Sequence, residues 1–127
     1  MIWTKSKNTN NLREVGSNAE SLVVSHLQKF GLTLVQLNFQ FKQGEIDIIM
    51  KDKNTWVFIE VKYRKTEGFG GPLSAISKSK QQKIRRCASF FLQNNGLNEY
   101  NAACRFDAVA LVGDLQSPQI TWLKNAF

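Results

Sequence analysis

The sequence predicts one domain of mixed α/β or α+β class, in which helices flank a mixed central β-sheet. Its 127 residues are enough for one compact domain and too few for two ordinary ones. Hydrophobic residues make up 43% of the chain and charged residues 21%, a composition typical of folded globular proteins. Segments with helical periodicity alternate along the chain with short segments of strand character, and such interleaving predicts helices packed on a sheet.

The expected elements follow the order helix, three strands, helix, two strands. A polar, Asn-rich arm of residues 1–11 precedes the first helix, which begins at Leu12 and is stopped by Gly31. The second helix is expected to start at Pro72, which suits a first helical position, and to end near Gln93. The strands are expected over residues 32–41, 44–50, 56–63, 105–112 and 119–123.

The chain is strongly basic, with a formal net charge of +7 and a pI of about 9.7. A small domain this basic often binds a polyanion such as nucleic acid, although the charge can also serve solubility alone. Between residues 62 and 86 the only acid is Glu67. The basic residues of this stretch, which suit contacts to backbone phosphates, are Lys62, Arg64, Lys65, Lys78, Lys80, Lys83, Arg85 and Arg86.

Several other features are expected to be structural or to concern location. Cys87 and Cys104 lack metal-type spacing and are expected to be reduced thiols. His26 is expected to be a satisfied core histidine, and Arg105 and Asp107 to form a structural ion pair. A polar N-terminus and the absence of an apolar run of about 20 residues predict no secretory signal, no membrane span and a cytoplasmic location.

The second and third strands place acids on faces that otherwise carry large apolar side chains, because side chains alternate between the faces of a strand. On the second strand Glu45, Asp47 and Ile49 share one face, opposite Ile46, Ile48 and Met50. On the third strand Trp56, Phe58, Glu60 and Lys62 share one face, opposite Val57, Ile59, Val61 and Tyr63. An acid on a covered face costs free energy unless it is paired or binds a cation.

A two-residue loop at residues 53–54 sets the register of this hairpin. The facing pairs are then Asp52–Thr55, Ile48–Ile59, Asp47–Glu60, Ile46–Val61 and Glu45–Lys62. Facing carboxylates such as Asp47 and Glu60 repel each other, and Mg²⁺ or Mn²⁺ between them relieves the repulsion.

This arrangement suggests a chemistry. A metal ion acidifies a bound water and neutralises phosphate charge, while Lys62 orients the water, helps to deprotonate it or stabilises the transition state. The alternative is a surface hairpin held by cross-strand salt bridges such as Glu45–Lys62, since Glu-x-Lys is a common string.

Two helical residues are candidates to support the site. Glu20 flanks the apolar stripe of the first helix, where it can reach the metal or serve as an ordinary flanking acid. Lys80 falls within the apolar face of the second helix, so it is expected either to point to the active site or to extend to the helix rim. The glycine-rich loop of residues 65–71 is a candidate flap over the substrate.

The motifs in this order resemble the YraN family of small bacterial proteins. They are Glu20, Gly44-Glu45-Ile46-Asp47, Phe58-Ile59-Glu60-Val61-Lys62-Tyr63-Arg64, Lys80, Arg105-Phe106-Asp107 and Asn125-Ala126-Phe127. The resemblance covers roughly residues 13–127. The family is placed in the PD-(D/E)xK nuclease superfamily and is similar to archaeal Holliday junction resolvases.

The resemblance implies a restriction-endonuclease-like fold and divalent-metal hydrolysis of phosphodiesters. It assigns Asp47 and Glu60 as metal ligands together with the Val61 carbonyl, Lys62 as the catalytic lysine and Glu20 as the helix acid. Ile46 stands where the superfamily motif has proline, a position that is often replaced.

The expected function is therefore a Mg²⁺- or Mn²⁺-dependent endonuclease acting on DNA, with branched or irregular structures among its candidate substrates. A nucleic-acid-binding accessory protein that cuts weakly or only with a partner is the alternative. A third hypothesis is a protein-interaction module with a basic face, which predicts no salt-sensitive DNA affinity. Because resolvases act as dimers on two-fold substrates, a homodimer is compatible with the first hypothesis.

Overall fold

The computed structural model describes residues 11–66 and 76–127, with side chains from residue 18 onward. The helices and strands are α1 (Asn11–Gln28), β1 (Thr33–Phe41), β2 (Gly44–Asp52), β3 (Thr55–Arg64), α2 (Lys78–Asn94), β4 (Cys104–Val112) and β5 (Gln119–Leu123). The predicted mixture of helices with a mixed sheet is confirmed. Neither helix of this described part is long and apolar enough to cross a membrane.

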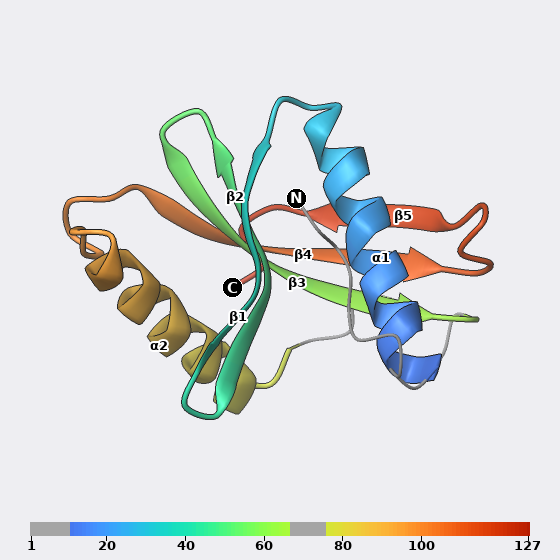
Figure 1. Ribbon diagram of the computed structural model, residues 1–127, viewed down its shortest axis with the longest axis horizontal. Coiled ribbons are helices and arrows are strands. Elements are labelled where there is room, and N and C mark those ends of the chain that lie inside the picture. The colour runs from blue at the N-terminus through green and yellow to red at the C-terminus, as the bar shows by residue number, and fades with distance from the viewer. Residues whose placement is uncertain (1–10, 67–75) are drawn as a thin grey trace.

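The strands form one five-stranded sheet in the order β1-β2-β3-β4-β5 (Figure 1). Only β3 and β4 run parallel, and α2 lies in the connection between them. The other neighbouring strands are antiparallel. The sheet twists so strongly that the β1–β2 hairpin crosses the direction of β4 and β5 in the view of Figure 1.

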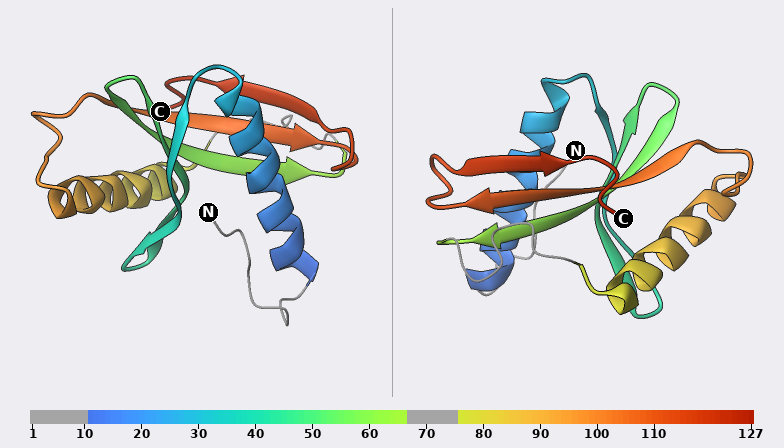
Figure 2. Two further views of the ribbon diagram at one scale, coloured as in Figure 1. Left: turned by 45° about the horizontal axis from the view of Figure 1, so that its top comes forward. Right: turned by 180° about the vertical axis from the view of Figure 1, so that it is seen from behind.

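The two helices cover opposite faces of this sheet, each over its own hydrophobic core (Figure 2). Beneath α1, Val23 and Leu27 pack with Ile48 and Ile59. Beneath α2, the core contains Ile49, Phe58, Ile84, Cys87, Phe91 and Phe106. The result is a helix–sheet–helix sandwich in which the middle parts of β2 and β3 are buried on both faces, so an acid there, such as Glu60, sits in a covered position.

The boundaries of the helices differ from the sequence prediction. Asn11 is already helical, although it was expected in the arm, and residues 1–10 lie outside the described part. Phe30 follows the end of α1 and is 60% exposed, so it does not extend the buried stripe. The predicted start at Pro72 lies outside the described residues, as do residues 67–71 of the predicted flap.

The second helix begins later than predicted, because residues 76–77 are described and are not helical. Ser77 has extended backbone angles, and its hydroxyl accepts a hydrogen bond from the Lys80 amide at 3.1 Å. A serine in this position satisfies an amide that the first helical turn leaves without a carbonyl partner, and it fixes the start of α2 at Lys78.

The hairpin register is confirmed over the strand ends nearest the turn and fails beyond them. The β2–β3 ladder includes the predicted pairs Asp52–Thr55 and Ile48–Ile59 and stops there. The expected facing pairs Ile46–Val61, Asp47–Glu60 and Glu45–Lys62 are therefore not ladder partners. The Val61 amide instead donates to Asp47 Oδ2 at 2.8 Å, so a side chain replaces the backbone partner.

The same interruption changes the orientation of Ile46. Ile48 and Met50 face the α1 core as predicted, but Ile46 packs in the α2 core with Ile49 and Phe58. Strict alternation would place Ile46 with Ile48, so the backbone loses its regular two-residue period at Asp47. The sheet thus opens at the residue that was predicted to lie at the centre of the active site.

The features expected to be structural are confirmed with one exception. Arg105 Nε contacts Asp107 at 3.1 Å, and both cysteines are free. His26 is only half-buried, with its ring 5.4 Å from that of Phe30, so it is not a core histidine. It lies in the last turn of α1.

Candidate active site

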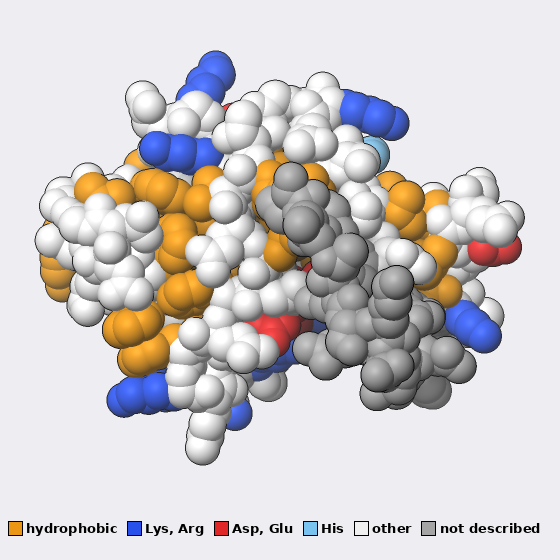
Figure 3. Space-filling model, viewed as in Figure 1, with side chains coloured by type: hydrophobic (Ala, Val, Ile, Leu, Met, Phe, Trp, Pro, Cys, Tyr) orange, Lys and Arg blue, Asp and Glu red, His pale blue; other side chains and the backbone are white. Residues whose placement is uncertain are grey.

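The interrupted end of β2 and β3 borders a pocket of about 350 Å³ against the first turns of α2. Its charged lining residues are Glu45, Asp47, Glu60, Lys80 and Lys83. Figure 3 shows acidic side chains in the lower middle of this face, with Lys and Arg side chains beside them. The pocket therefore combines carboxylates with cations, in contrast to the apolar cores on either side of the sheet.

Three carboxylates from α1 and β2 meet in one place. Glu20, Glu45 and Asp47 each offer an oxygen, and these oxygens lie within 4.8 Å of one another. Glu20 is 9% exposed and follows the buried Ala19, so the packing of α1 on the sheet carries it inward. Such a set of oxygen donors fits the coordination preference of Mg²⁺ or Mn²⁺.

Glu45 is the member of this group that the sequence reasoning left out. It was expected to face Lys62, but it accepts a hydrogen bond from Gln40 Nε2 on β1 at 2.9 Å. Its position two residues before Asp47 on the same strand was the available signal. The sequence interpretation gave Glu45 no metal-binding role and considered its salt bridge with Lys62 only as the alternative to a metal site.

The pKa of the Asp47 carboxyl group is strongly perturbed. Burial raises its pKa well above the ordinary value, and the charges of Glu60 and Glu20 raise it further. The hydrogen bond from the Val61 amide acts in the opposite direction and is outweighed. A half-buried acid among other acids holds a proton or a cation to relieve the repulsion.

Glu60 and Lys80 are brought together as an ion pair across the pocket. Burial lowers the pKa of Lys80, but the Glu60 carboxylate outweighs this effect, and Asp47 and Glu45 add to it, so the net pKa is raised. Lys80 thus reaches the site, as one of the two sequence hypotheses proposed.

Contrary to the sequence prediction, Lys80 does not reach the site from the apolar face of α2. Lys80 is 53% exposed on its side chain, so it does not sit within the buried face of α2. The helix starts only at Lys78, and its buried residues begin at Ile84. Lys80 therefore extends from the open N-terminal end of the helix toward Glu60.

Lys62 lies two residues beyond Glu60 on the same face of β3. Partial burial lowers its pKa, the nearby charges of Arg64 and Lys80 lower it further, and Glu60 opposes them. Lys62 therefore gives up its proton more readily than an ordinary exposed lysine. It stands beside the pocket and is not among the described residues that line it.

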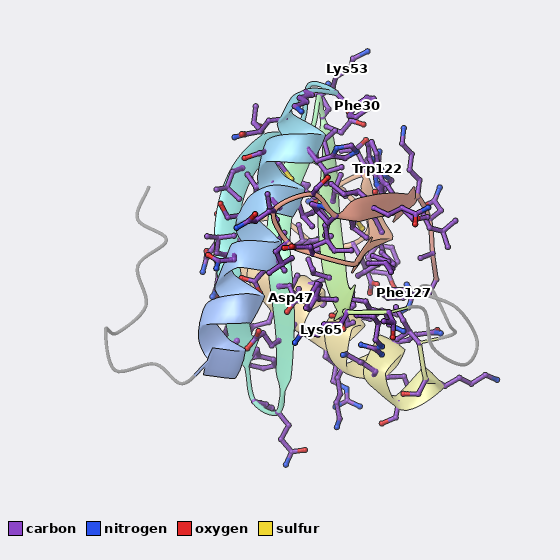
Figure 4. The ribbon with its side chains drawn as sticks, turned by 90° about the vertical axis from the view of Figure 1, so that its right-hand side faces the viewer. Phe30, Asp47, Lys53, Lys65, Trp122 and Phe127 are labelled. Atoms are coloured by element: carbon purple, nitrogen blue, oxygen red, sulfur yellow. The ribbon has the colours of Figure 1, made fainter. Side chains whose placement is uncertain are left out.

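The remaining basic residues divide into separate groups. Arg64, Lys65 and Lys78 are exposed, and Figure 4 shows Lys65 in the same half of the molecule as Asp47, with Phe30 and Trp122 at the other end. Arg86 lines a second, adjoining pocket. Arg85 instead lies over the Phe106 ring at 4.6 Å, close to Phe127, and lines a third pocket. The predicted basic surface is thus not one continuous patch.

The chain is similar in sequence to the members of one protein family. A sequence model of the "Uncharacterised protein family UPF0102" matches residues 19–111. A UPF0102 protein of Colwellia psychrerythraea is 54% identical over 130 residues, covering 100% of both chains. A UPF0102 protein of a Shewanella species is 46% identical, covering 89% of this chain and 98% of that protein. One of Yersinia pseudotuberculosis is 40% identical, covering 91% and 95%. The matched segment contains all four acids of the site, Glu20, Glu45, Asp47 and Glu60, and its three lysines, Lys62, Lys80 and Lys83.

Proposed function

The chain belongs to the UPF0102 family, and we propose that it is a metal-dependent endonuclease that hydrolyses phosphodiester bonds in DNA. The observation that carries the proposal is the convergence of Glu20, Glu45 and Asp47 within 4.8 Å beside cationic side chains. A placement among PD-(D/E)xK nucleases, with a restriction-endonuclease-like fold, is part of this proposal.

The acids have distinct roles in the proposed site. Asp47 is the central ligand for Mg²⁺ or Mn²⁺, with Glu20 and Glu45 beside it. Glu60 lines the same pocket, and the resemblance to known nucleases assigns it and the Val61 carbonyl as further ligands. When bound, the ion acidifies a coordinated water and neutralises charge on the phosphate. The Val61 amide fixes the orientation of Asp47 throughout.

The lysines supply positive charge where the phosphate must enter. Lys80 holds Glu60 in place through their ion pair and stands at the pocket opening. Lys62 carries a lowered pKa, which suits it to orient a water, accept its proton, or donate a hydrogen bond to the phosphoryl oxygens as their charge increases. These roles match those expected for the lysine of a Glu-x-Lys pair.

DNA is the proposed substrate, with branched or irregular structures among the candidates. The net charge of +7 attracts a polyanion. A DNA-binding accessory protein that cuts weakly or only with a partner is the second candidate. The acid cluster favours the first, because clustered carboxylates repel DNA phosphates and serve a pure binder poorly. A homodimer and a cytoplasmic location remain predictions.

Cleavage of labelled DNA tests the proposal. Four-way junction, flap, single-stranded and duplex DNA would each be incubated with Mg²⁺ and with Mn²⁺. We expect cleavage that falls at least about a hundredfold in Asp47→Ala and in Lys62→Ala. Lys29→Ala, which removes an exposed charge at the far end of α1, is the matched control and should cut normally.

The outcomes separate the candidates. Cleavage that persists in Asp47→Ala would assign the activity to a contaminant and contradict the proposal. Tight binding of the junction with no cleavage in either metal would favour the accessory protein. Binding that is absent or insensitive to salt would contradict both candidates and favour a protein-interaction module.

A further inference from the structure

A second, smaller pocket adjoins the acidic one at the turn between β1 and β2. It has a volume of about 150 Å³. It is lined by Phe41, Lys42, Gln43, Gly44, Lys83 and Arg86. Gln43, Gly44 and Lys83 line both pockets, so the two share a wall. A nucleic-acid strand that left the acidic pocket past Gly44 would therefore reach the smaller pocket next.

The wall between the pockets is fixed by close backbone packing. A Cβ atom at Gly44 would lie 2.6 Å from Cys87 Sγ and 2.9 Å from the Lys83 carbonyl oxygen, so only glycine fits there. The Cys87 thiol donates to the Phe41 carbonyl at 3.6 Å, a further contact between the turn and α2. The turn is therefore held against the helix, with Lys42 presented beside the helix side chains.

All of the charged side chains that line this pocket are positive. Its lining includes three cations, Lys42, Lys83 and Arg86, and no acid. None of the ion pairs within the described part of the chain involves any of the three. The Phe41 ring is stacked on Phe90, with centroids 3.9 Å apart, and Lys42 Nζ lies 5.4 Å from the Phe41 centroid. A rigid pocket with three cations suits a phosphate group.

We propose that this pocket binds the phosphate that neighbours the reacting phosphate on the same nucleic-acid strand. The inference rests on the proposed function for its position next to the scissile bond, because successive nucleotides carry successive phosphates. Lys83 borders both pockets and can contact either group. Lys42 lies outside the basic stretch of residues 62–86, and the fold brings it there.

Adjacent arginines on α2 provide a matched test. Arg86 lines the pocket, whereas Arg85 lies over the Phe106 ring at 4.6 Å and has no part in it. Both are exposed, so glutamine at either position should leave the fold intact, which a thermal melt verifies. Lys42→Gln removes the cation supplied by the turn.

The measurement is fluorescence anisotropy of labelled four-way junction and duplex DNA across a salt series in EDTA, where metal-dependent cleavage does not occur. Arg86→Gln and Lys42→Gln should each weaken binding about threefold to tenfold and reduce the salt slope by about one. Arg85→Gln should stay within about twofold of wild type. Equal losses in Arg85→Gln and Arg86→Gln would overturn the pocket as a specific site.

The result is separable from the test of cleavage. Cleavage by the wild type together with equal losses in the two arginine variants would keep the nuclease and refute the pocket. An Arg86-specific loss without any cleavage would keep the phosphate pocket and refute the nuclease. A thermal-shift titration with inorganic phosphate forms a second arm. Arg86-dependent stabilisation by the free ion, with DNA binding unaffected by Arg86→Gln, would identify a small-anion site and overturn the proposal.

Discussion

Asp47 on β2 and Asp107 on β4 are two acids of one sheet. Their surroundings differ in how many hydrogen-bond donors and how many other carboxylates lie near each of them. Asp107 is 0% exposed and accepts hydrogen bonds from Arg105 Nε at 3.1 Å, from Trp122 Nε1 at 3.0 Å and from the Asn125 amide at 3.0 Å. A carboxylate with this many donors and an adjacent guanidinium is satisfied within the protein.

Asp47 has the opposite environment. The Val61 amide donates to it at 2.8 Å, but Glu20 and Glu45 bring two more carboxylates within 4.8 Å. Burial and the charges of Glu60 and Glu20 raise its pKa. The comparison shows that two acids of one sheet can differ in how far the protein itself satisfies their charge. An excess of carboxylates over donors makes Asp47 the better candidate for a cation site, because an added cation stabilises such a cluster.

The largest effect is expected from Asp107→Asn. It removes the more deeply buried of the two carboxylates paired with Arg105, the other being Asp52, and it sets the new amide NH2 group against the donors of Arg105, Trp122 and Asn125. We expect a loss of about 3–5 kcal/mol in the free energy of unfolding, measured by urea denaturation. Glu99→Gln, an exposed change of the same type, should cost little. A loss below about 1 kcal/mol would show that the Asp107 network is not a main support of the fold.

The next largest effect on the free energy of unfolding is expected from a divalent cation bound at Asp47. At a Mg²⁺ or Mn²⁺ concentration about 100 times the Kd, binding to the folded state should add about 2.7 kcal/mol of stability. The measurement is the thermal unfolding midpoint with metal and with EDTA. Asp47→Asn should abolish most of the shift, whereas Glu99→Gln should keep it. An equal shift in all three proteins would place the metal elsewhere.

The smallest effect should come from Asp47→Asn in the absence of metal, and it should be stabilising by about 1 kcal/mol near pH 7. Asparagine keeps an acceptor for the Val61 amide and removes the charge that Glu20 and Glu60 oppose. Because the folded pKa of Asp47 is raised, the contribution of Asp47 to wild-type stability is greatest below the ordinary value of 3.8 and is lost as pH rises through the folded value.

The gain from Asp47→Asn should therefore grow with pH from about pH 4 upward. Denaturation curves at several pH values in EDTA would reveal it. A gain that is constant with pH, or a loss at neutral pH, would show that the Asp47 charge is relieved within the protein, as at Asp107.

Much of this comparison was accessible from the sequence. Alternation of apolar residues predicted the two-sided burial of β2 and β3, and the short turn at residues 53–54 predicted the register from Asp52 to Ile48. The pairing of Arg105 with Asp107 followed from their spacing on one strand. These features depend on local periodicity, which a sequence displays directly.

The parts that were wrong or missing depend on contacts between distant segments. Periodicity places Ile46 with Ile48, and the strand departs from it at Asp47, whose side chain accepts a hydrogen bond from the Val61 amide. The approach of Glu20 to Glu45 depends on how α1 packs, and Lys42 joins α2 only through the position of a turn. No local pattern encodes these distances.

The close contact at Gly44 has a consequence for spacing. The acidic pocket and the cationic pocket are separated by backbone atoms of the turn and of α2, which adjust far less than side chains do. A larger residue at position 44 would push the turn away from the helix and lengthen the interval between the two pockets. Glycine at this position therefore sets the distance between the two pockets, which has to match the spacing of successive phosphates along a nucleic-acid strand.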